Sequence, residues 1–151
     1  MAQTHIVTLD LNFQGRPHAI ASYLIRQGDA VVLIESGPGS TLSALEAGLA
    51  AVKGKRMLNS ITGKENDLSK LLPMAKKYDA WVIGLTIDED GVPATVEKRV
   101  EIAAKILAAA MDQGIPVTDL FIDPITLPIN CAQDQPEKMF AAISQFRMLS
   151  D

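Results

Sequence analysis

Three short apolar segments of the sequence each end in polar side chains that could contact a small molecule. The segment RMLNSIT carries Asn59, AWVIGLTID ends at Asp88, and LFID ends at Asp123, which Pro124 follows directly. Ligands of parallel α/β sheets bind beyond the carboxyl ends of the strands. If these segments are neighbouring parallel strands, their polar ends meet at one rim and form a candidate binding site.

An amide and a carboxylate at the same rim suit a flat heterocycle with amide-like edges. A carboxylate accepts two hydrogens from an amino–NH edge, as in a pterin, and the Asn59 amide both donates and accepts. Unpaired buried polar edges are costly, so such a pair is selective. The alternative is that each residue only caps the loop or helix after it. Both interpretations stay open for Asn59 and Asp123, whereas capping is favoured for Asp88 in the turn DEDG.

The elements that would hold this rim are indicated by the spacing of apolar residues. HIVTLDLN is expected to be a strand, and AIASYLI and DAVVLIES are expected to form a β-hairpin that turns at Gly28. Apolar residues at helical spacing predict a helix over residues 42–52, with Gly54 as its C-cap.

From residue 56 onwards, strands are expected to alternate with helices. The strands are 56–62, 80–88 and 120–124; the helices begin at a capping box, Thr62 to Glu65, at Val96, and at Pro136. In the helix from Val96, an apolar stripe is expected through Val96, Val100, Ala103, Leu107 and Ala110. Such alternation means parallel strands with right-handed crossovers. The predicted fold is α/β, an open mixed sheet with an N-terminal β-hairpin followed by βα repeats.

Composition limits the classes of function. The 151 residues fit one domain, and the net charge of −4 gives no electrostatic reason to expect nucleic acid or an acidic membrane as a partner. The single cysteine, Cys131, allows no internal disulfide, and the N-terminus MAQTHIVTLDLN lacks the pattern of a signal peptide. A cytoplasmic protein is expected. The only histidines, His5 and His18, are expected at the surface, so no bound metal is expected.

Residues 44–133 resemble the pterin-binding barrel of methyltetrahydrofolate:corrinoid methyltransferases, relatives of dihydropteroate synthase, through KRMLNSITGKE, YDAWVIGLTIDEDG and TDLFIDPITLPI. The resemblance implies about half of a TIM barrel, a tetrahydrofolate or other pterin ligand, and a corrinoid protein as partner. In that family the Asn of the L-N-S strand and the Asp of the I-D-P strand bind the pterin, which implies these roles for Asn59 and Asp123. Family chemistry moves the N5-methyl group to a reduced cobalt, with hydrogen bonding at N5 aiding departure of the pterin.

Two departures from the family pattern bear on turnover. A further pterin-contacting Asp of the family would fall near Pro38, where this sequence reads ESGPGS, and Glu35 stands three residues earlier. The strand that carries the family's methyl-transfer Asn is not found within the 151 residues. We therefore expect a pterin-binding domain that is incomplete for turnover, and leave open whether it is an enzyme.

Residues 1 to about 50 resemble the N-terminus of metallo-β-lactamase-fold hydrolases, although the H-x-H-x-D-H metal motif is absent. The sequence is accordingly interpreted as one domain, 1–151, with a chimeric origin: a hydrolase-like segment 1–43 joined to a half-barrel segment 44–151. The alternative function is a folded chimeric scaffold without native activity. Exposed strand edges favour pairing between copies, so a homodimer is a further hypothesis.

Overall fold

A computed structural model describes residues 4–10, 16, 21–27, 30–34, 42–51, 53–128, 130 and 132–149 of the chain. Its strands are β1 (Thr4–Asp10), β2 (Ala21–Gln27), β3 (Ala30–Ile34), β4 (Arg56–Thr62), β5 (Ala80–Leu85) and β6 (Leu120–Asp123). Its α-helices are α1 (Leu42–Ala51), α2 (Glu65–Lys77), α3 (Val96–Asp112) and α4 (Gln135–Phe146). Short 3-10 helices span Val117–Asp119 and Arg147–Leu149.

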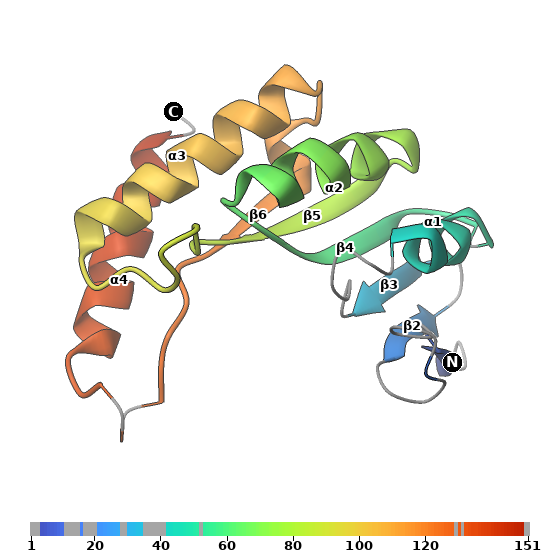
Figure 1. Cartoon of the computed structure of the whole chain (residues 1–151), viewed down its shortest axis with the longest axis horizontal. Helices are drawn as coiled ribbons and strands as arrows, with labels where there is room; N and C mark the ends of the chain where they lie inside the picture. Colours follow the sequence, from blue (N-terminus) through green and yellow to red (C-terminus); the bar gives the residue numbers. More distant parts are fainter. Residues whose placement is uncertain are drawn as a thin grey trace.

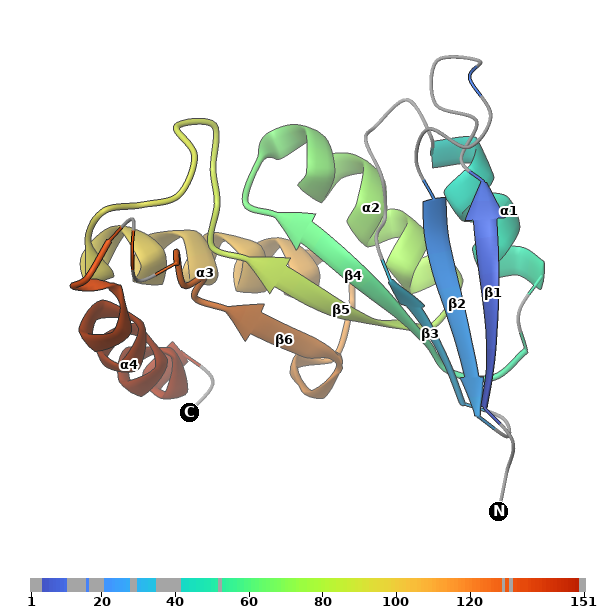
Figure 2. The same ribbon diagram turned by 90° about the horizontal axis from the view of Figure 1, so that it is seen from below.

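All six described strands form one sheet in chain order, from β1 at one edge to β6 at the other (Figure 1; β1 is labelled in Figure 2). The pairs β1–β2 and β2–β3 are antiparallel, whereas β3–β4, β4–β5 and β5–β6 are parallel. This confirms the predicted open mixed sheet, with an N-terminal hairpin followed by βα repeats as in part of a TIM barrel. The four parallel strands place the carboxyl ends of β4, β5 and β6 at one rim.

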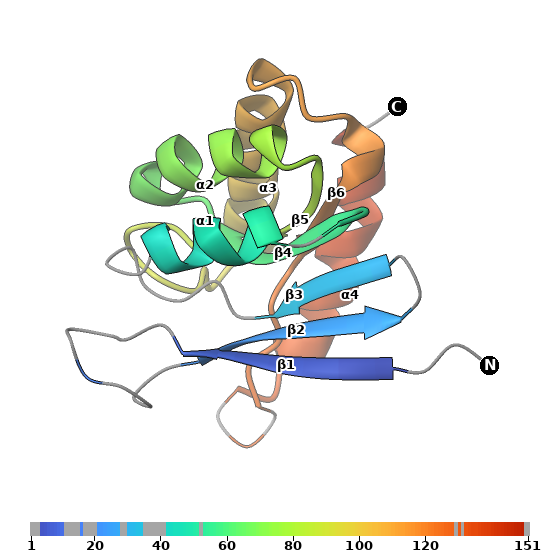
Figure 3. The ribbon, with the colours of Figure 1, turned by 90° about the vertical axis from the view of Figure 1, so that its right-hand side faces the viewer.

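Helices α1, α2 and α3 lie on one face of the sheet (Figure 3). The core fills the space between them and the strands, and its fully buried residues include Leu45, Leu58, Leu72, Val82 and Ile106. Figure 2 looks at the opposite face, where β4, β5 and β6 stand in front of α2 and α3.

Strand β5 shows the difference between the two faces. Burial alternates along it, with Ala80 and Val82 buried on the helix side and Trp81 and Ile83 only half-buried on the other. On β6, Phe121 contacts Trp81 edge-to-face and remains 47% exposed. We call this side of β4–β6 the open face.

The start of α2 differs from the prediction. Its N-cap is Lys64, which makes no side-chain capping hydrogen bond, so the Thr62–Glu65 capping box is wrong. Strand β4 continues through Thr62, whose Oγ1 accepts the Lys64 N–H at 3.3 Å and donates to Asp67 at 2.6 Å. The Thr62 hydroxyl therefore stabilises the turn between β4 and α2 and does not cap α2.

The buried stripe of α3 also differs. It runs through Arg99, Ile102, Ala103, Ile106 and Ala110, so only two members of the predicted stripe are fully buried. The packing surface of α3 is thus rotated from the predicted one, and it carries a charged residue.

Candidate functional site

Asn59 and Asp123 lie on the same face of the sheet. In the strand register Asn59 is beside Ile83, Ile83 is beside Phe121, and Asp123 is beside Leu85. Side chains alternate between the faces of a strand. Because the neighbours of Asn59 and Asp123 within β4 and β6 pack into the helix-side core, these two side chains belong to the open face. They flank β5 near its carboxyl end, as the sequence predicted.

The Asp123 carboxylate is exposed and held by its own turn. Its Oδ1 accepts the Ile125 N–H at 2.8 Å, and Ile125 has a φ of +59°, unusual for a β-branched residue. The Asp123 carbonyl accepts hydrogen bonds from the N–H and Oγ1 of buried Thr86, at 3.0 and 3.2 Å. The turn occupies one carboxylate oxygen, and Oδ2 makes no hydrogen bond within the described part of the chain. Asp123 thus combines the capping role with a free acceptor.

Asn59 is half-buried, and its amide makes no side-chain hydrogen bond to any described residue. The β4–β5 register shifts between Asn59 and Ile61, and the Asn59–Ser60 peptide bond is cis. Most buried polar side chains in proteins have a hydrogen-bond partner in the protein or in ordered water, and a half-buried amide also reaches solvent. An amide without one on the open face is therefore available to a ligand.

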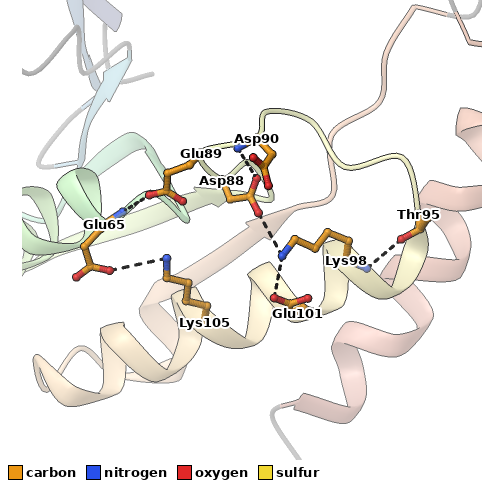
Figure 4. Close-up of polar contacts among 8 residues, drawn as sticks. All are labelled: Glu65, Asp88, Glu89, Asp90, Thr95, Lys98, Glu101 and Lys105. Carbon is orange, nitrogen blue, oxygen red and sulfur yellow. Dashed lines mark hydrogen bonds and ion pairs between the residues drawn. The ribbon is translucent and has the colours of Figure 1, made fainter.

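Asp88 serves the loop instead of the open face, as the capping interpretation predicted. Its side chain is largely buried, Oδ1 accepts the Asp90 N–H at 3.0 Å, and Oδ2 lies 3.4 Å from Lys98 Nζ (Figure 4). The hydrogen bond to Glu101, and secondarily the contact with Asp88, raises the pKa of Lys98. These contacts tie the β5–α3 loop to the first turns of α3.

The same loop also supplies the missing cap of α2. The Glu89 carboxylate accepts the Glu65 N–H at 2.9 Å, and this hydrogen bond lowers the pKa of Glu89 (Figure 4). An anionic side chain at a helix N-terminus is stabilised by the unpaired N–H groups and the helix dipole. This hydrogen bond therefore connects the loop after β5 to the start of α2, next to the rim.

Several predicted positions lie outside the described residues, namely Glu35, Pro38, His18 and Cys131. His5 is exposed on β1, in agreement with a surface role. Among the residues that the structure describes, no group of three or more His, Cys, Asp or Glu could hold a metal ion. None of the helices in the described ranges has the length and apolar character needed to cross a membrane.

Comparison with known proteins decides the family. Residues 39–150 match the family described as "Pterin binding enzyme". The chain belongs to this family. It is 27% identical over 145 residues to methionine synthase of Mycobacterium tuberculosis H37Rv and 28% identical over 145 residues to that of Mycobacterium leprae TN. It is 30% identical over 88 residues to the methylcorrinoid:tetrahydrofolate methyltransferase of Eubacterium limosum.

The matches cover different shares of the chains. Each methionine synthase match covers 89% of this chain but 12% of the relative, and the Eubacterium match covers 57% of this chain and 32% of the relative. This pterin-binding domain is thus related to tetrahydrofolate methyltransferases, and it spans a minor part of their length. Residues 44–151 make up less than 89% of the chain. The methionine synthase matches, which cover 89%, therefore extend into residues 1–43. The hydrolase-like origin of that segment, and the chimera, remain predictions.

Proposed function

We propose that the open face of β4–β6 binds the pterin ring of a folate between Asn59 and Asp123. The observation that carries the proposal is their placement: two side chains with unused hydrogen-bonding capacity flank β5 on one face. The proposal is also supported by membership of the pterin binding enzyme family.

Each residue has a distinct role in this arrangement. Asp123 accepts hydrogen bonds from the amino–NH edge of the ring through Oδ2, while the Ile125 N–H fixes the orientation of Oδ1. Asn59 donates to and accepts from another edge. Ile83, which lies between Asn59 and Phe121 in the register, gives the ring an apolar floor. Small-molecule sites commonly combine such apolar surface with a few placed polar groups.

We further propose that the folate is methyltetrahydrofolate and that the partner is a corrinoid protein. The support is the similarity to methionine synthase and to a methylcorrinoid:tetrahydrofolate methyltransferase. When bound, methyltetrahydrofolate supplies an N5-methyl group for transfer. The residues of the open face bind and orient its ring, and Pro38 in place of the family's further Asp remains our reason to expect weak turnover. A cytoplasmic location and a homodimer also stay predictions.

The test is calorimetric titration with methyltetrahydrofolate of the wild type, Asp123→Ala, and Asp112→Ala. Asp112 is an exposed carboxylate at the end of α3 and serves as the matched control. A hydrogen bond to a charged group contributes about 1.5–3 kcal/mol, so Asp123→Ala should weaken binding about 10- to 150-fold. The Asp112→Ala variant should bind like the wild type.

Two results would count against the proposal. Absence of binding by a wild type that unfolds cooperatively would overturn pterin binding and favour the inactive scaffold. Unchanged affinity of a folded Asp123→Ala variant would remove Asp123 from the site. Methyl transfer to a corrinoid protein is the second measurement: binding without transfer supports incomplete turnover, and transfer contradicts it.

A further inference from the structure

Arg99 is a fully buried cation that forms no salt bridge with any residue in the described part of the chain. It lies in the first turn of α3 and is 0% exposed. Its Nη2 donates to the Pro93 carbonyl at 3.3 Å and to Oε1 of Gln135. Its Nε and Nη1 are buried and have no hydrogen-bond partner among the residues that the structure describes. The nearby carboxylate of Asp134 is instead paired with Lys138 at 2.6 Å.

Stability does not explain this arginine. Burial lowers the pKa of Arg99, and the nearby Asp134 carboxylate opposes this effect only in part. Buried charges are normally paired, and even a complete buried ion pair often adds no stability compared with apolar side chains of similar volume. A residue that breaks the local packing rule without a stability gain is expected to have a functional reason.

The two partners of Arg99 indicate that reason. Pro93 lies in the loop between β5 and α3, and Gln135 is the first residue of α4, after the loop that follows β6. Both loops leave the same end of the sheet (Figure 1). At their beginnings they are joined by the hydrogen bonds from Thr86 to Asp123. Arg99 joins them again near their far ends.

The loop after β6 begins with a strained turn, and Thr126 Oγ1 also ties it to α4 by a hydrogen bond to Met139 Sδ at 2.6 Å. It opens with the Asp123–Ile125 turn, in which Ile125 adopts the left-handed conformation. A non-glycine residue held there is strained and persists only when the surrounding structure holds it. If the far end of the loop moved, Ile125 could relax and the Asp123 carboxylate would lose its fixed orientation.

The geometry points to Arg99 as a positioning residue for the pterin site, through the two loops it joins. This inference rests on the proposed function. Arg99 does not touch the ligand: it holds Gln135 and Pro93, and thereby keeps the Asp123 turn in the conformation that presents Oδ2 on the open face. Loss of the guanidinium should therefore impair binding while leaving global stability intact.

The experiment compares Arg99→Met with the wild type by thermal unfolding, hydrogen exchange of the Ile125 amide, and titration with methyltetrahydrofolate. Met keeps an unbranched apolar chain and removes the buried charge. We expect a melting temperature close to that of the wild type, because loss of an unpaired buried charge offsets the donor that Gln135 and Pro93 lose. We expect Ile125 exchange faster by about tenfold and affinity weaker by about tenfold, the order expected from one lost hydrogen bond to a charged group. Unchanged exchange and affinity would overturn the inference.

Variants at Gln135 separate positioning from folding. Gln135→Glu gives Arg99 a carboxylate, so it should raise the melting temperature and retain wild-type exchange and affinity. Gln135→Met breaks the same contact and should reproduce the faster exchange and weaker binding. If Arg99→Met does not fold, Gln135→Met decides: wild-type exchange would overturn the inference. If the wild type binds no pterin, the proposed function fails, while exchange at Ile125 still tests the role of Arg99.

Discussion

Replacing Gly63 by alanine tests the packing that holds the rim in place. Gly63 follows β4, and its N–H donates to the Ile87 carbonyl at 2.7 Å. A Cβ atom added to Gly63 would lie 2.5 Å from Cγ2 of Ile102 and 3.1 Å from the Ile87 carbonyl oxygen. Ile102 is 2% exposed and β-branched, so its side chain has little freedom to withdraw. The backbone oxygen could move only by disturbing the segment that directly follows β5.

The cost follows from these distances. Overpacking a well-filled core costs about 1–3 kcal/mol, and contact with both a β-branched side chain and a backbone atom places Gly63→Ala near the upper value. Alanine also restricts the unfolded chain, which returns up to about 1 kcal/mol. The free energy of unfolding should therefore fall by about 2 kcal/mol. For a chain of this size the melting temperature should fall by about 4–8 °C.

Urea and thermal unfolding of Gly63→Ala, Ile102→Leu and the double variant measure this effect. Leucine lacks Cγ2, so Ile102→Leu should cost less than about 1.5 kcal/mol alone and restore part of the loss in the double variant. Gly91→Ala is the control. An added Cβ atom there meets open space, so any loss of stability comes from the φ of +99° and not from a steric clash. Ile102→Leu should not rescue it. A Gly63→Ala protein as stable as the wild type, or no rescue, would refute the steric argument.

Two further predictions concern the rim and the sheet's opposite end. Ile125→Asn should keep the free energy of unfolding or raise it by up to about 1 kcal/mol, because asparagine tolerates a φ of +59°. A clearly lower free energy of unfolding, measured with urea, would contradict the claim that Ile125 is strained. At the other end, Lys55 Nζ lies 2.8 Å from Asp79, and this hydrogen bond lowers the pKa of Asp79. The resulting stabilisation is present above the usual Asp pKa and is lost as pH falls through the lower folded value. In the Lys55→Met variant, the free energy of unfolding should therefore fall less steeply between about pH 5 and 2 than in the wild type. If the two proteins lose stability in parallel over this range, the Lys55–Asp79 contact is not the cause.

The sequence could predict the order of strands and helices because the relevant signals are local. Apolar spacing along the chain identified the hairpin, β4, β5, β6 and the helices between them. It also placed Asn59 and Asp123 at one rim, since parallel strands bring their carboxyl ends to the same edge. What local pattern could not supply was the partner of each polar group. Thr62 and Glu65 have the spacing of a capping box, yet Glu89, distant in sequence, accepts the Glu65 N–H.

Tertiary structure alone decided which surfaces and charges are buried. The register shift after Asn59 determines how β4 meets β5, and it depends on pairing between strands. From sequence alone, a charged residue such as Arg99 is expected on the solvent-facing side of α3. In the structure, Arg99 is buried and donates hydrogen bonds to Pro93 and Gln135. The physical reason is the same in both cases: burial and hydrogen bonding join residues far apart in the chain. The sequence by itself indicated Asn59 and Asp123 as candidate binding residues, and the fold determined how these two side chains are held.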